Sequence, residues 1–570
     1  MGKSDSQSFD LIILGGGCAG LATALFASLR GLKPIVLECT EFVGGTSALS
    51  AGAIWIPGTD EGRAVNPDDN REAVETYLRR VTGNLAGTAM QRRFLDMGPK
   101  AVHALTENTH VELRAFPFHP DYFSDLDGAT VNGRVLQALP FDGRVLRGAL
   151  NRVRPPIREF TLLGGMMVDR IDIAHFLNAT HSWGSFRYSA GLVRRHLVRK
   201  LSGRRSPRLV MGAALIGRLL ASLMDRNVPV LTKVETLALD RENGRVIGIR
   251  ARRGEEEFAL KSRGGVVLAG GGFNRNAALR AELISDAPAF SPIAPGSTGR
   301  TIELALALGA RLGAQNKGHA FWAPVSVAKR RDGTEAVFPH FVLDRAKPGT
   351  LVVNEAGQRF LNESASYNVF ARAMIEANRT QPCIPAYLIA DHRALKTYGL
   401  GLVRPGGWGR RRLRKIGYLS VGRTIADLAQ SLGLPPDQLA RTVDRMNTFA
   451  VTGADPDFKR GETIYERSLG DPRVGPNPTL GKIATPPFYA IKLYPSDIGA
   501  STGLVTDGDA QVLGGGASGD DPIGGLYAVG NDMDSVMGGA YPGPGITLGP
   551  AIAFAYAAAQ RAAEDLKARP

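Results

Sequence analysis

A glycine-rich turn between two apolar segments near the N-terminus constrains the fold of this chain most strongly. Residues 10–14 form a short apolar run typical of a buried parallel strand, and Gly-Gly-Gly-Cys-Ala-Gly follows at 15–20. A helical pattern over 21–29 leads to a second apolar run at 34–37, which ends at Glu38. The order of these segments predicts a complete βαβ unit of the dinucleotide-binding type.

Each glycine of this turn has a distinct physical role. Gly15 permits the tight turn, Gly17 lets the backbone approach a pyrophosphate, and Gly20 lets the helix pack on the strand. The N-terminus of the helix stabilises phosphate charge. Glu38 is placed to accept hydrogen bonds from the adenosine ribose. Two further cofactor contacts are expected in the same turn, at Cys18 and Ala19.

The continuation at residues 44–52 favours FAD over a nicotinamide cofactor. This segment consists almost entirely of small residues and carries several hydroxyl groups. Such a segment can cross the pyrophosphate and then run beneath a flat ring that leaves little room for side chains. We expect cofactor contacts here at Gly45, Thr46, Ser47 and Gly52.

Three later segments predict further parts of a flavin site. Residues 265–273 indicate a buried strand with a glycine-rich exit, and residues 525–531 indicate another strand with a polar end. A helix expected over 546–563 has a positive N-terminal end that could stabilise the negative charge of a reduced flavin. The expected contacts are Ala269, Gly270, Gly530, Asn531 and Leu548.

The length and composition indicate a globular protein of several domains. The chain has 570 residues, 44% apolar and 22% charged, which suits two or three domains. Its three cysteines form no CxxC pair, so we expect neither a disulfide framework nor a metal site. Residues 1–9 lack the apolar core of a signal peptide, and no apolar run reaches ~20 residues. We therefore expect a cytoplasmic protein, either soluble or peripheral on the inner face of the membrane.

The positive charge is concentrated in one region. The net charge is +15, and residues 144–218 contain fifteen Arg or Lys residues against three acidic ones. Aromatic residues and an apolar run over 209–224 accompany this charge, a mixture typical of an amphipathic surface that lies on an anionic membrane. A basic run at 410–415 could extend the same face. A solvated insertion or an oligomer contact explains the pattern equally well. No nucleic-acid-binding module accompanies the charge, so no nucleic-acid partner is expected.

The sequence Tyr541-Pro542-Gly543-Pro544-Gly545, just before the last predicted helix, suggests chemistry. The prolines fix φ and the glycines permit conformations closed to other residues, so a rigid turn is expected. The Tyr541 hydroxyl and the Gly545 amide, aimed at one point, would form an oxyanion hole. In the simpler interpretation, the turn only leads the chain into its helix.

Together these segments resemble the FAD-binding superfamily of fumarate reductases, succinate dehydrogenases and 3-ketosteroid dehydrogenases over most of the chain. The resemblance implies an α/β fold in which a Rossmann-type FAD-binding domain, residues 1–328 and 504–570, is interrupted by an α+β catalytic domain at 329–503. Residues 144–218 would be an insertion in the first part. A strand at 351–354, a turn at Gly357 and a second strand through 364 resemble the start of the family's catalytic domain.

Residues 535–545 resemble the signature of the 3-ketosteroid Δ1-dehydrogenases in particular. This stretch contains no arginine that matches the dicarboxylate site of the fumarate reductases, and no histidine for a covalent flavin link follows residues 44–52. The resemblance implies noncovalent FAD and a neutral ketone substrate.

The resemblance also implies roles for individual residues. Tyr541 and Gly545 would stabilise the enolate oxygen of a 3-ketosteroid while the C1 hydride moves to flavin N5. Tyr367 would take the C2 proton, assisted by Tyr122. Because a free phenol has a pKa near ~10, such a base requires a lowered pKa or an alkaline optimum.

Several functional readings stay open from the sequence. The leading one is FAD-dependent 1,2-dehydrogenation of 3-ketosteroids in steroid degradation. Its substrates would include bulky steroids such as cholest-4-en-3-one, drawn from a membrane. An external acceptor, a quinone or another compound, would take the electrons. A second is a related flavoenzyme, either a Δ4-dehydrogenase or a fumarate-reductase-like reductase. A third is a flavin-bearing membrane adaptor with an inert site.

Overall fold

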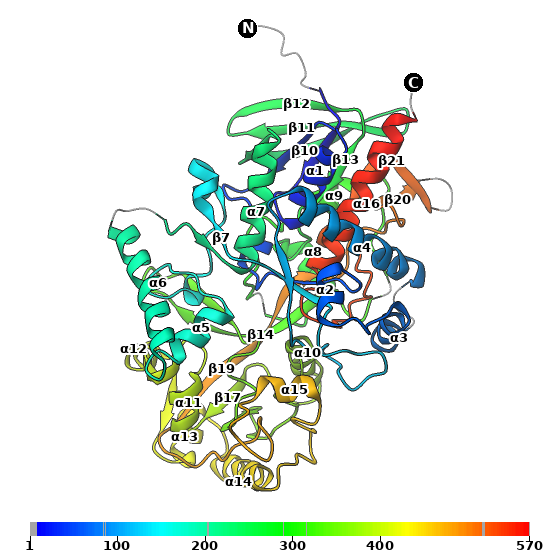
Figure 1. The fold of residues 1–570 in the computed structure, drawn as a ribbon. Coiled ribbons are helices and arrows are strands. Elements are labelled where there is room, and N and C mark those ends of the chain that lie inside the picture. Colours follow the sequence, from blue (N-terminus) through cyan, green and yellow to red (C-terminus); the bar gives the residue numbers. More distant parts are fainter. Residues whose placement is uncertain are drawn as a thin grey trace.

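The structure is a computed structural model that describes residues 8–83, 85, 87–201, 205–288, 290–314, 316–515 and 519–568. Figure 1 shows two bodies, one containing both ends of the described chain and the other built mainly from residues 320–500. The expected α/β class, with a Rossmann-type domain interrupted by an α+β domain, is confirmed.

The first body is built on a six-stranded sheet that joins the two ends of the chain. Its strands pair in parallel except at one edge, where β20 runs antiparallel to β21. The residues of β2 are completely buried, as expected for a central strand that reads as a continuous apolar run. In spatial order the strands are β20 (Gln511–Gly515), β21 (Asp521–Ala528), β13 (Val266–Leu268), β2 (Leu11–Leu14), β3 (Pro34–Glu38) and β9 (Val230–Thr232).

Four helices pack together beside this sheet, and two of them, α1 and α16, contact its strands directly. Helix α1 (Cys18–Leu29) contacts both α16 (Leu548–Lys567) and α7 (Met211–Asp225), and α16 also contacts α4 (Thr88–Asn108). The small residues that dominate α1 and α16 allow this close approach.

Helix α7 corrects one expectation from the sequence. Its residues from Gly212 to Leu223 are buried, so the apolar run at 209–224 belongs to the core. The prediction that this run forms part of an amphipathic surface is therefore wrong. Arg218, inside the same helix, is 4% exposed and donates to the carbonyl oxygens of Leu139, His110 and Pro140.

Two smaller sheets complete the first body. One is β1 (Ser8–Phe9), β12 (Glu256–Ser262), β11 (Arg245–Arg253) and β10 (Glu235–Glu242), and the other is β4 (Ala53–Trp55), β6 (Val135–Ala138) and β5 (Leu113–Ala115). The body also contains α2 (Asp60–Val65), α3 (Arg71–Thr82), α8 (Ala277–Leu283) and α9 (Arg300–Leu306). The three-stranded sheet matters most for function because β4 supports the turn before α16.

The second body is an antiparallel sheet covered by helices. Its strands are β15 (Glu335–Pro339), β14 (Ala320–Lys329), β19 (Phe488–Ala500), β17 (Ala386–Ala390) and β16 (Thr350–Val353), and β18 (Ser420–Gly422) also pairs with β19. The helices are α10 (Tyr367–Ala377), α11 (His392–Tyr398), α13 (Ile425–Leu432), α14 (Pro436–Thr452) and α15 (Ile464–Leu469). The sheet already includes β14, which lies before the boundary placed at residue 329.

The start of this body differs in part from the expectation. Strand β16 and the turn at Gly357, with φ of +73°, are present. The second strand expected through residue 364 does not form, and the segment is irregular up to α10. Buried ion pairs hold it instead of a strand ladder, as described below.

The basic segment contributes helices to one flank of the molecule. It contains η2 (Gly143–Arg152), η3 (Arg158–Phe160), α5 (Arg170–Leu177) and α6 (Trp183–Leu201), and in Figure 1 α5 and α6 appear on the same side of the view as α12 (Arg410–Lys415) of the second body. The Arg404 guanidinium joins the two regions by donating to the carbonyl oxygen of Thr161 at 2.6 Å. Across the described part of the chain, no helix has the length and apolar character needed to span a bilayer.

Candidate active site

Three tyrosines that are far apart in the sequence meet at the junction of the two bodies. The ring centroids of Tyr122 and Tyr367 are 5.5 Å apart, those of Tyr367 and Tyr541 are 5.3 Å apart, and those of Tyr122 and Tyr541 are 5.7 Å apart. The hydroxyl groups of Tyr122 and Tyr541 both act on the pKa of Tyr367. The structure thus brings together the three tyrosines singled out in the sequence.

The turn before α16 presents several backbone amides that have no acceptor among the described residues, and the Gly545 amide is one of them. Gly545 has φ of +97°, and a Cβ there would lie 2.3 Å from the carbonyl oxygen of Ala53. Only glycine satisfies both constraints. The Gly545 carbonyl accepts a hydrogen bond from the Trp55 amide, whereas no acceptor for the Gly545 amide is found among the described residues. That free amide and the Tyr541 hydroxyl are the two donors expected of an oxyanion hole.

Tyr122 is fixed by a buried ionic network on its N-terminal side. Asp121 accepts a hydrogen bond from the Trp55 indole at 2.9 Å and pairs with Arg134 at 2.7 Å. Arg134 is 1% exposed and pairs also with Asp69. Burial raises the pKa of Asp121 to about 6, while Arg134 opposes that rise. This network connects strand β4, which supports Gly545, to the residue next to Tyr122.

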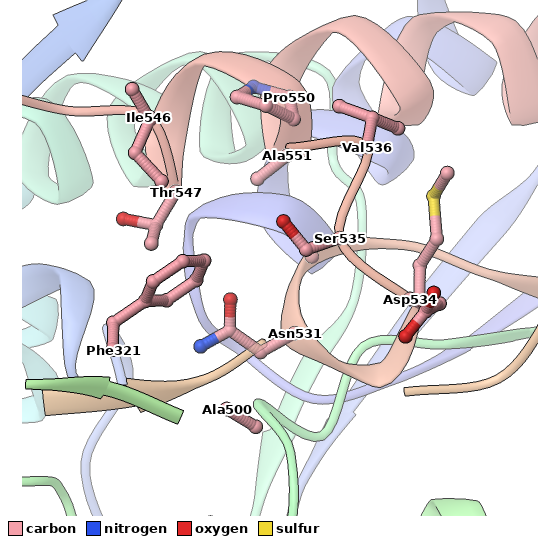
Figure 2. Close-up of a pocket in the computed structure, with 12 residues that line it drawn as sticks. Phe321, Ala500, Asn531, Asp534, Ser535, Val536, Ile546, Thr547, Pro550 and Ala551 are labelled. Atoms are coloured by element: carbon pink, nitrogen blue, oxygen red, sulfur yellow. The ribbon is translucent and has the colours of Figure 1, made fainter. Parts of the chain in front are cut away.

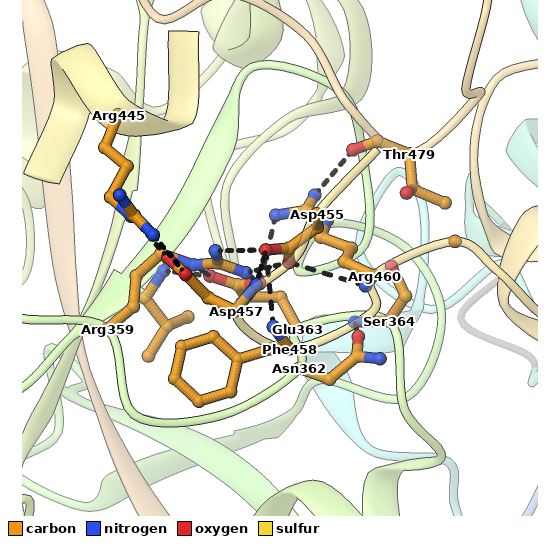
Figure 3. A network of polar contacts seen from close by, with 12 residues as sticks. Arg359, Asn362, Glu363, Ser364, Arg445, Asp455, Asp457, Phe458, Arg460 and Thr479 are labelled. Atoms are coloured by element: carbon orange, nitrogen blue, oxygen red, sulfur yellow. Dashed lines mark hydrogen bonds and ion pairs between the residues drawn. The ribbon is translucent and has the colours of Figure 1, made fainter. Parts of the chain in front are cut away.

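Tyr367 is the first residue of α10 and is held from the preceding segment. The Glu363 carboxylate is buried between the guanidinium groups of Arg359 at 2.7 Å and Arg460 at 3.3 Å, and Arg359 also pairs with Asp455 (Figure 3). Both arginines hold the pKa of Glu363 below its usual range against the effect of burial. The irregular segment that leads to Tyr367 is therefore anchored by charge.

Burial dominates the acid–base properties of the tyrosines. It raises the pKa of Tyr541 to about 12 and the pKa values of Tyr122 and Tyr367 well above 10. Tyr541 therefore remains a hydrogen-bond donor at neutral and moderately alkaline pH. The cations of the basic segment 144–218 are not among the main influences on these pKa values. Arg345 of the second body does influence them, since it lowers the pKa of Tyr122.

A small cavity adjoins the tyrosine cluster. Phe321, whose ring centroid is 5.2 Å from that of Tyr541, lines this cavity together with residues around the start of α16 (Figure 2). None of the lining residues is cationic and one is acidic. They are Phe321, Ala500, Gly530, Asn531, Met533, Asp534, Ser535, Val536, Ile546, Thr547, Pro550 and Ala551.

The N-terminal turn has the backbone geometry that a dinucleotide needs. A Cβ at Gly15 would lie 2.1 Å from the Ala269 carbonyl oxygen, and one at Gly20 would lie 1.9 Å from the Gly15 carbonyl oxygen. Gly17 instead faces free space, since the nearest atom to a Cβ there is the Ser47 hydroxyl oxygen at 4.0 Å. A side chain at Gly17 would fill the space that the pyrophosphate occupies in such sites.

The other residues predicted to contact the cofactor lie around this turn. Glu38, at the end of β3, accepts from the Gly16 amide at 2.8 Å through Oε2, which keeps a further lone pair for a ribose hydroxyl, whereas Oε1 already accepts from the Thr40 amide and hydroxyl. Ser47 accepts from the Cys18 amide, and Thr46 accepts from the Ala294 amide. A Cβ at Gly530 would approach Ala19 to 2.9 Å, and one at Gly45 would lie 3.6 Å from Gly17.

The remaining positions lie along the same path. Gly52 packs against Met211 and Gly212, Gly270 donates to Asp532 at 2.6 Å, Asn531 lines the cavity and Leu548 begins α16. This glycine-lined path from the turn to the cavity fits FAD. The contacts of individual residues with FAD stay predictions.

The sequence analysis missed several residues of the site. Arg345, Tyr465 and the Asp121–Arg134 pair stand in no motif, and only contacts between distant segments reveal them. Asp532 offered a signal, because it directly follows the polar end predicted at 525–531, and its carboxylate receives the Gly270 and Gly272 amides.

Comparison with known proteins agrees with this geometry. Residues 10–548 match the family model described as FAD binding domain. The chain is 35% identical to 4-oxocyclohex-2-ene-1-carboxylate 5-dehydrogenase of Sinomonas cyclohexanicum, over 98% of this chain and 94% of that protein. It is 34% identical to 3-oxosteroid 1-dehydrogenase of Mycobacterium tuberculosis, over 98% of this chain and 99% of that protein.

A solved structure extends the likeness to the complete fold. The crystal structure of 3-ketosteroid Δ1-dehydrogenase from Sterolibacterium denitrificans in complex with 1,4-androstadiene-3,17-dione superimposes with a TM-score of 0.90 at 33% identity, covering 98% of this chain and 100% of that one. The protein uses FAD, and it belongs to the family of FAD-binding oxidoreductases that includes the 3-oxosteroid 1-dehydrogenases.

Proposed function

We propose that the protein is a 3-oxosteroid 1-dehydrogenase that introduces a double bond between C1 and C2 of the steroid A ring. The observation that supports this most is the meeting of Tyr122, Tyr367 and Tyr541 beside the unpaired Gly545 amide. This arrangement offers two donors to a ketone oxygen and a phenol pair for the proton.

The two donors act on the 3-keto oxygen. As the C2 proton leaves, negative charge builds up on that oxygen, and donors already in place stabilise it without rearrangement. Tyr541 suits this role because its high pKa keeps the hydroxyl protonated. Gly545 suits it because its amide has no acceptor among the residues that the structure describes.

Tyr367 takes the C2 proton, and Tyr122, whose ring centroid is 5.5 Å from that of Tyr367, assists it. Bound FAD supplies the hydride acceptor for C1. Both phenols are buried, which shields the proton transfer from bulk water.

The relatives named 3-oxosteroid 1-dehydrogenase favour a neutral steroid ketone, whereas the Sinomonas relative is named for a ring ketone that bears a carboxylate. The Tyr541 hydroxyl and the Gly545 amide bind a ketone oxygen and need no charge elsewhere on the substrate. Turnover therefore has to be compared between the two kinds of ketone.

The test is turnover with a panel of ketones and an artificial electron acceptor. We expect androst-4-ene-3,17-dione and cholest-4-en-3-one to be oxidised faster than 4-oxocyclohexanecarboxylate, with the new double bond at C1–C2. A product desaturated at C4–C5 from a saturated 3-ketosteroid would instead identify a Δ4-dehydrogenase. Absence of any turnover by flavin-loaded protein would favour the inert membrane adaptor.

The basic flank fits contact with an anionic membrane that holds sterols. On α6, Trp183 is 72% exposed and Leu201 is 89% exposed, and the same helix contains five Arg or Lys residues and no acidic one. In the second body, Trp408 is 76% exposed and precedes the cations of α12, and the nearby Arg404 donates to the Thr161 carbonyl oxygen of the basic segment. Exposed aromatic and cationic side chains together suit the headgroup region of an anionic leaflet. The external electron acceptor is of a class that the site does not specify.

A further inference from the structure

Arg154 of the basic segment lies inside the protein, beside the loop that follows β3. It is 7% exposed, and its guanidinium donates to the Thr40 hydroxyl oxygen at 2.7 Å and to the Phe42 carbonyl oxygen at 3.4 Å. Both acceptors are neutral, and the Arg154 Nε–H has no acceptor among the described residues. Burial lowers the pKa of Arg154, and the Glu38 carboxylate is the largest influence that opposes it. A buried cation with these partners costs folding stability, so we expect its position to serve function.

Backbone contacts fix Arg154 next to the dinucleotide-binding turn. The Arg154 amide donates to the Val43 carbonyl oxygen at 2.8 Å, and the Val43 amide donates to the Arg152 carbonyl oxygen at 2.7 Å, which makes a short parallel bridge. The amide of the next residue, Gly44, donates to the Gly16 carbonyl oxygen at 2.8 Å. One continuous set of hydrogen bonds therefore joins the basic segment to the turn expected to bind the pyrophosphate.

Two further arginines hold the main chain around Arg154. The Arg205 guanidinium donates to three carbonyl oxygens within residues 150–154, at distances from 2.5 to 3.3 Å. The Arg152 guanidinium donates to the Val230 carbonyl oxygen of β9, the strand next to β3. Residues 150–154 are thus tied to the edge of the sheet, which keeps Arg154 against Thr40.

A chain of hydrogen bonds leads from Arg154 to Glu38. The Thr40 hydroxyl donates to Glu38 Oε1 at 2.6 Å, and the Thr40 amide donates to the same oxygen at 2.8 Å. The hydroxyl has one hydrogen, and the charged Oε1 is a nearer and stronger acceptor than the Phe42 carbonyl oxygen at 2.9 Å. Because Arg154 donates to the hydroxyl oxygen, it polarises the O–H group and strengthens its bond to Glu38. Oε1 is thereby occupied, and Oε2, which accepts from the Gly16 amide, keeps a lone pair.

We propose that Arg154 and Thr40 are positioning residues for FAD, which fix the Glu38 carboxylate in the orientation that accepts a hydrogen bond from the adenosine ribose. A free Glu carboxylate rotates easily about its last side-chain bond, and the chain from Arg154 removes that freedom. Part of the charge of the basic segment therefore serves the cofactor and not a surface. Because FAD binding precedes turnover, this role does not depend on which ketone the enzyme oxidises.

The test is FAD binding by the full chain after removal of its flavin, measured from the quenching of flavin fluorescence. The probes are FAD and its two analogues that lack the 2′ or the 3′ hydroxyl of the adenosine ribose. In the parent, at least one analogue should bind about tenfold more weakly than FAD, since a hydrogen bond to a carboxylate is lost. In Thr40→Val and in Arg154→Gln, we expect Kd for FAD to rise about tenfold and the ratio of analogue Kd to FAD Kd to fall toward one.

Two variants serve as controls. Thr40→Ser keeps the hydroxyl and should restore both the affinity and the ratio of the parent. Thr442→Val also removes a buried hydroxyl, which donates to the Gly357 carbonyl oxygen at 2.7 Å in the second body, and should leave FAD binding unchanged.

The ratio of the two Kd values separates positioning from a purely structural effect. If Thr40→Val weakens FAD and the analogues by the same factor, or leaves the affinity for FAD unchanged, the proposed role is overturned. Equal binding of FAD and both analogues by the parent would overturn it as well. If Arg154→Gln does not fold, Thr40→Val decides, because it breaks the same chain at its middle.

Discussion

The backbone amide of Tyr122 donates a hydrogen bond of 2.9 Å to the carbonyl oxygen of Pro542. The Tyr77 hydroxyl donates to the same oxygen at 2.6 Å. One carbonyl therefore links the loop of the proton-handling tyrosine to the turn that presents Tyr541 and Gly545. A shift of that turn by an ångström would displace both the ketone-binding donors and Tyr122, and misplacement on this scale is costly in catalysis.

Tyr541→Phe removes one of the two donors to the ketone oxygen. We expect kcat for dye-coupled steroid oxidation to fall by roughly 10²-fold or more, since a lost oxyanion-hole donor has about this effect. Flavin absorbance should stay unchanged. Tyr527→Phe serves as the control, because Tyr527 is also buried but binds Asp565 at the other end of the first body. Equal activity of the two variants would remove Tyr541 from the mechanism.

Gly545→Ala tests the close approach of this turn to β4. The added Cβ would meet the Ala53 carbonyl oxygen at 2.3 Å, so the turn must move and the amide must leave its position. We expect steroid oxidation to fall at least as far as in Tyr541→Phe. Gly417→Ala is the control, because Gly417 also has a positive φ, +75°, but a Cβ there would meet no atom within 4 Å. It therefore imposes backbone strain without a collision and should cost only about 1 kcal/mol of folding stability. A fully active Gly545→Ala enzyme would contradict the assignment.

Asp121→Asn tests the ionic support beneath Tyr122. The change leaves buried Arg134 with one carboxylate partner, and we expect a loss of about 3 kcal/mol in the free energy of unfolding by urea. Asp60→Asn breaks an exposed pair with Arg63 and should cost less than about 1 kcal/mol. Similar stability of the two variants would show that the buried pair does not support the site.

The pH dependence of Tyr541 has a defined sign. Burial raises its pKa in the folded protein to about 12, above the value of 10 for an exposed phenol. The folded state thus favours the protonated phenol, and this contribution to stability is complete below pH 10 and is lost as the pH rises toward 12. Ultraviolet titration should show that Tyr541→Phe removes a tyrosine that ionises near pH 12. Loss of a tyrosine that ionises near pH 10 would contradict the burial effect.

Membrane contact is tested by sedimentation with liposomes that contain phosphatidylserine. Replacing Trp183 and Phe186 of α6 with serine should reduce binding several-fold, and salt should weaken binding by the parent protein. Val451→Ser, a change of a 61% exposed residue on α14, is the control. Point substitutions are preferable to deleting residues 144–218, because that deletion would also remove part of α7, which belongs to the core. Unchanged binding by the double variant would refute the membrane surface.

Local sequence patterns determined the cofactor-binding part of the fold. The order of strand, glycine turn, helix and strand at 10–38 needs only neighbouring residues, and β2, α1 and β3 form as predicted. The same kind of pattern predicted the strand before Gly530 and the helix that begins at Leu548. The turn at 541–545 could also be predicted, because each proline restricts φ and each glycine widens its range.

Only the tertiary structure decided which apolar and charged residues are covered. The run at 209–224 has the composition of a surface helix mixed with cations, yet α1 packs on it and makes it core. The Asp121–Arg134 pair and the contact between the rings of Tyr122 and Tyr465 join segments that no local pattern connects. Burial and electrostatic effects depend on what lies across the interface between segments, so the sequence could name three of the tyrosines but not the groups that set their pKa values.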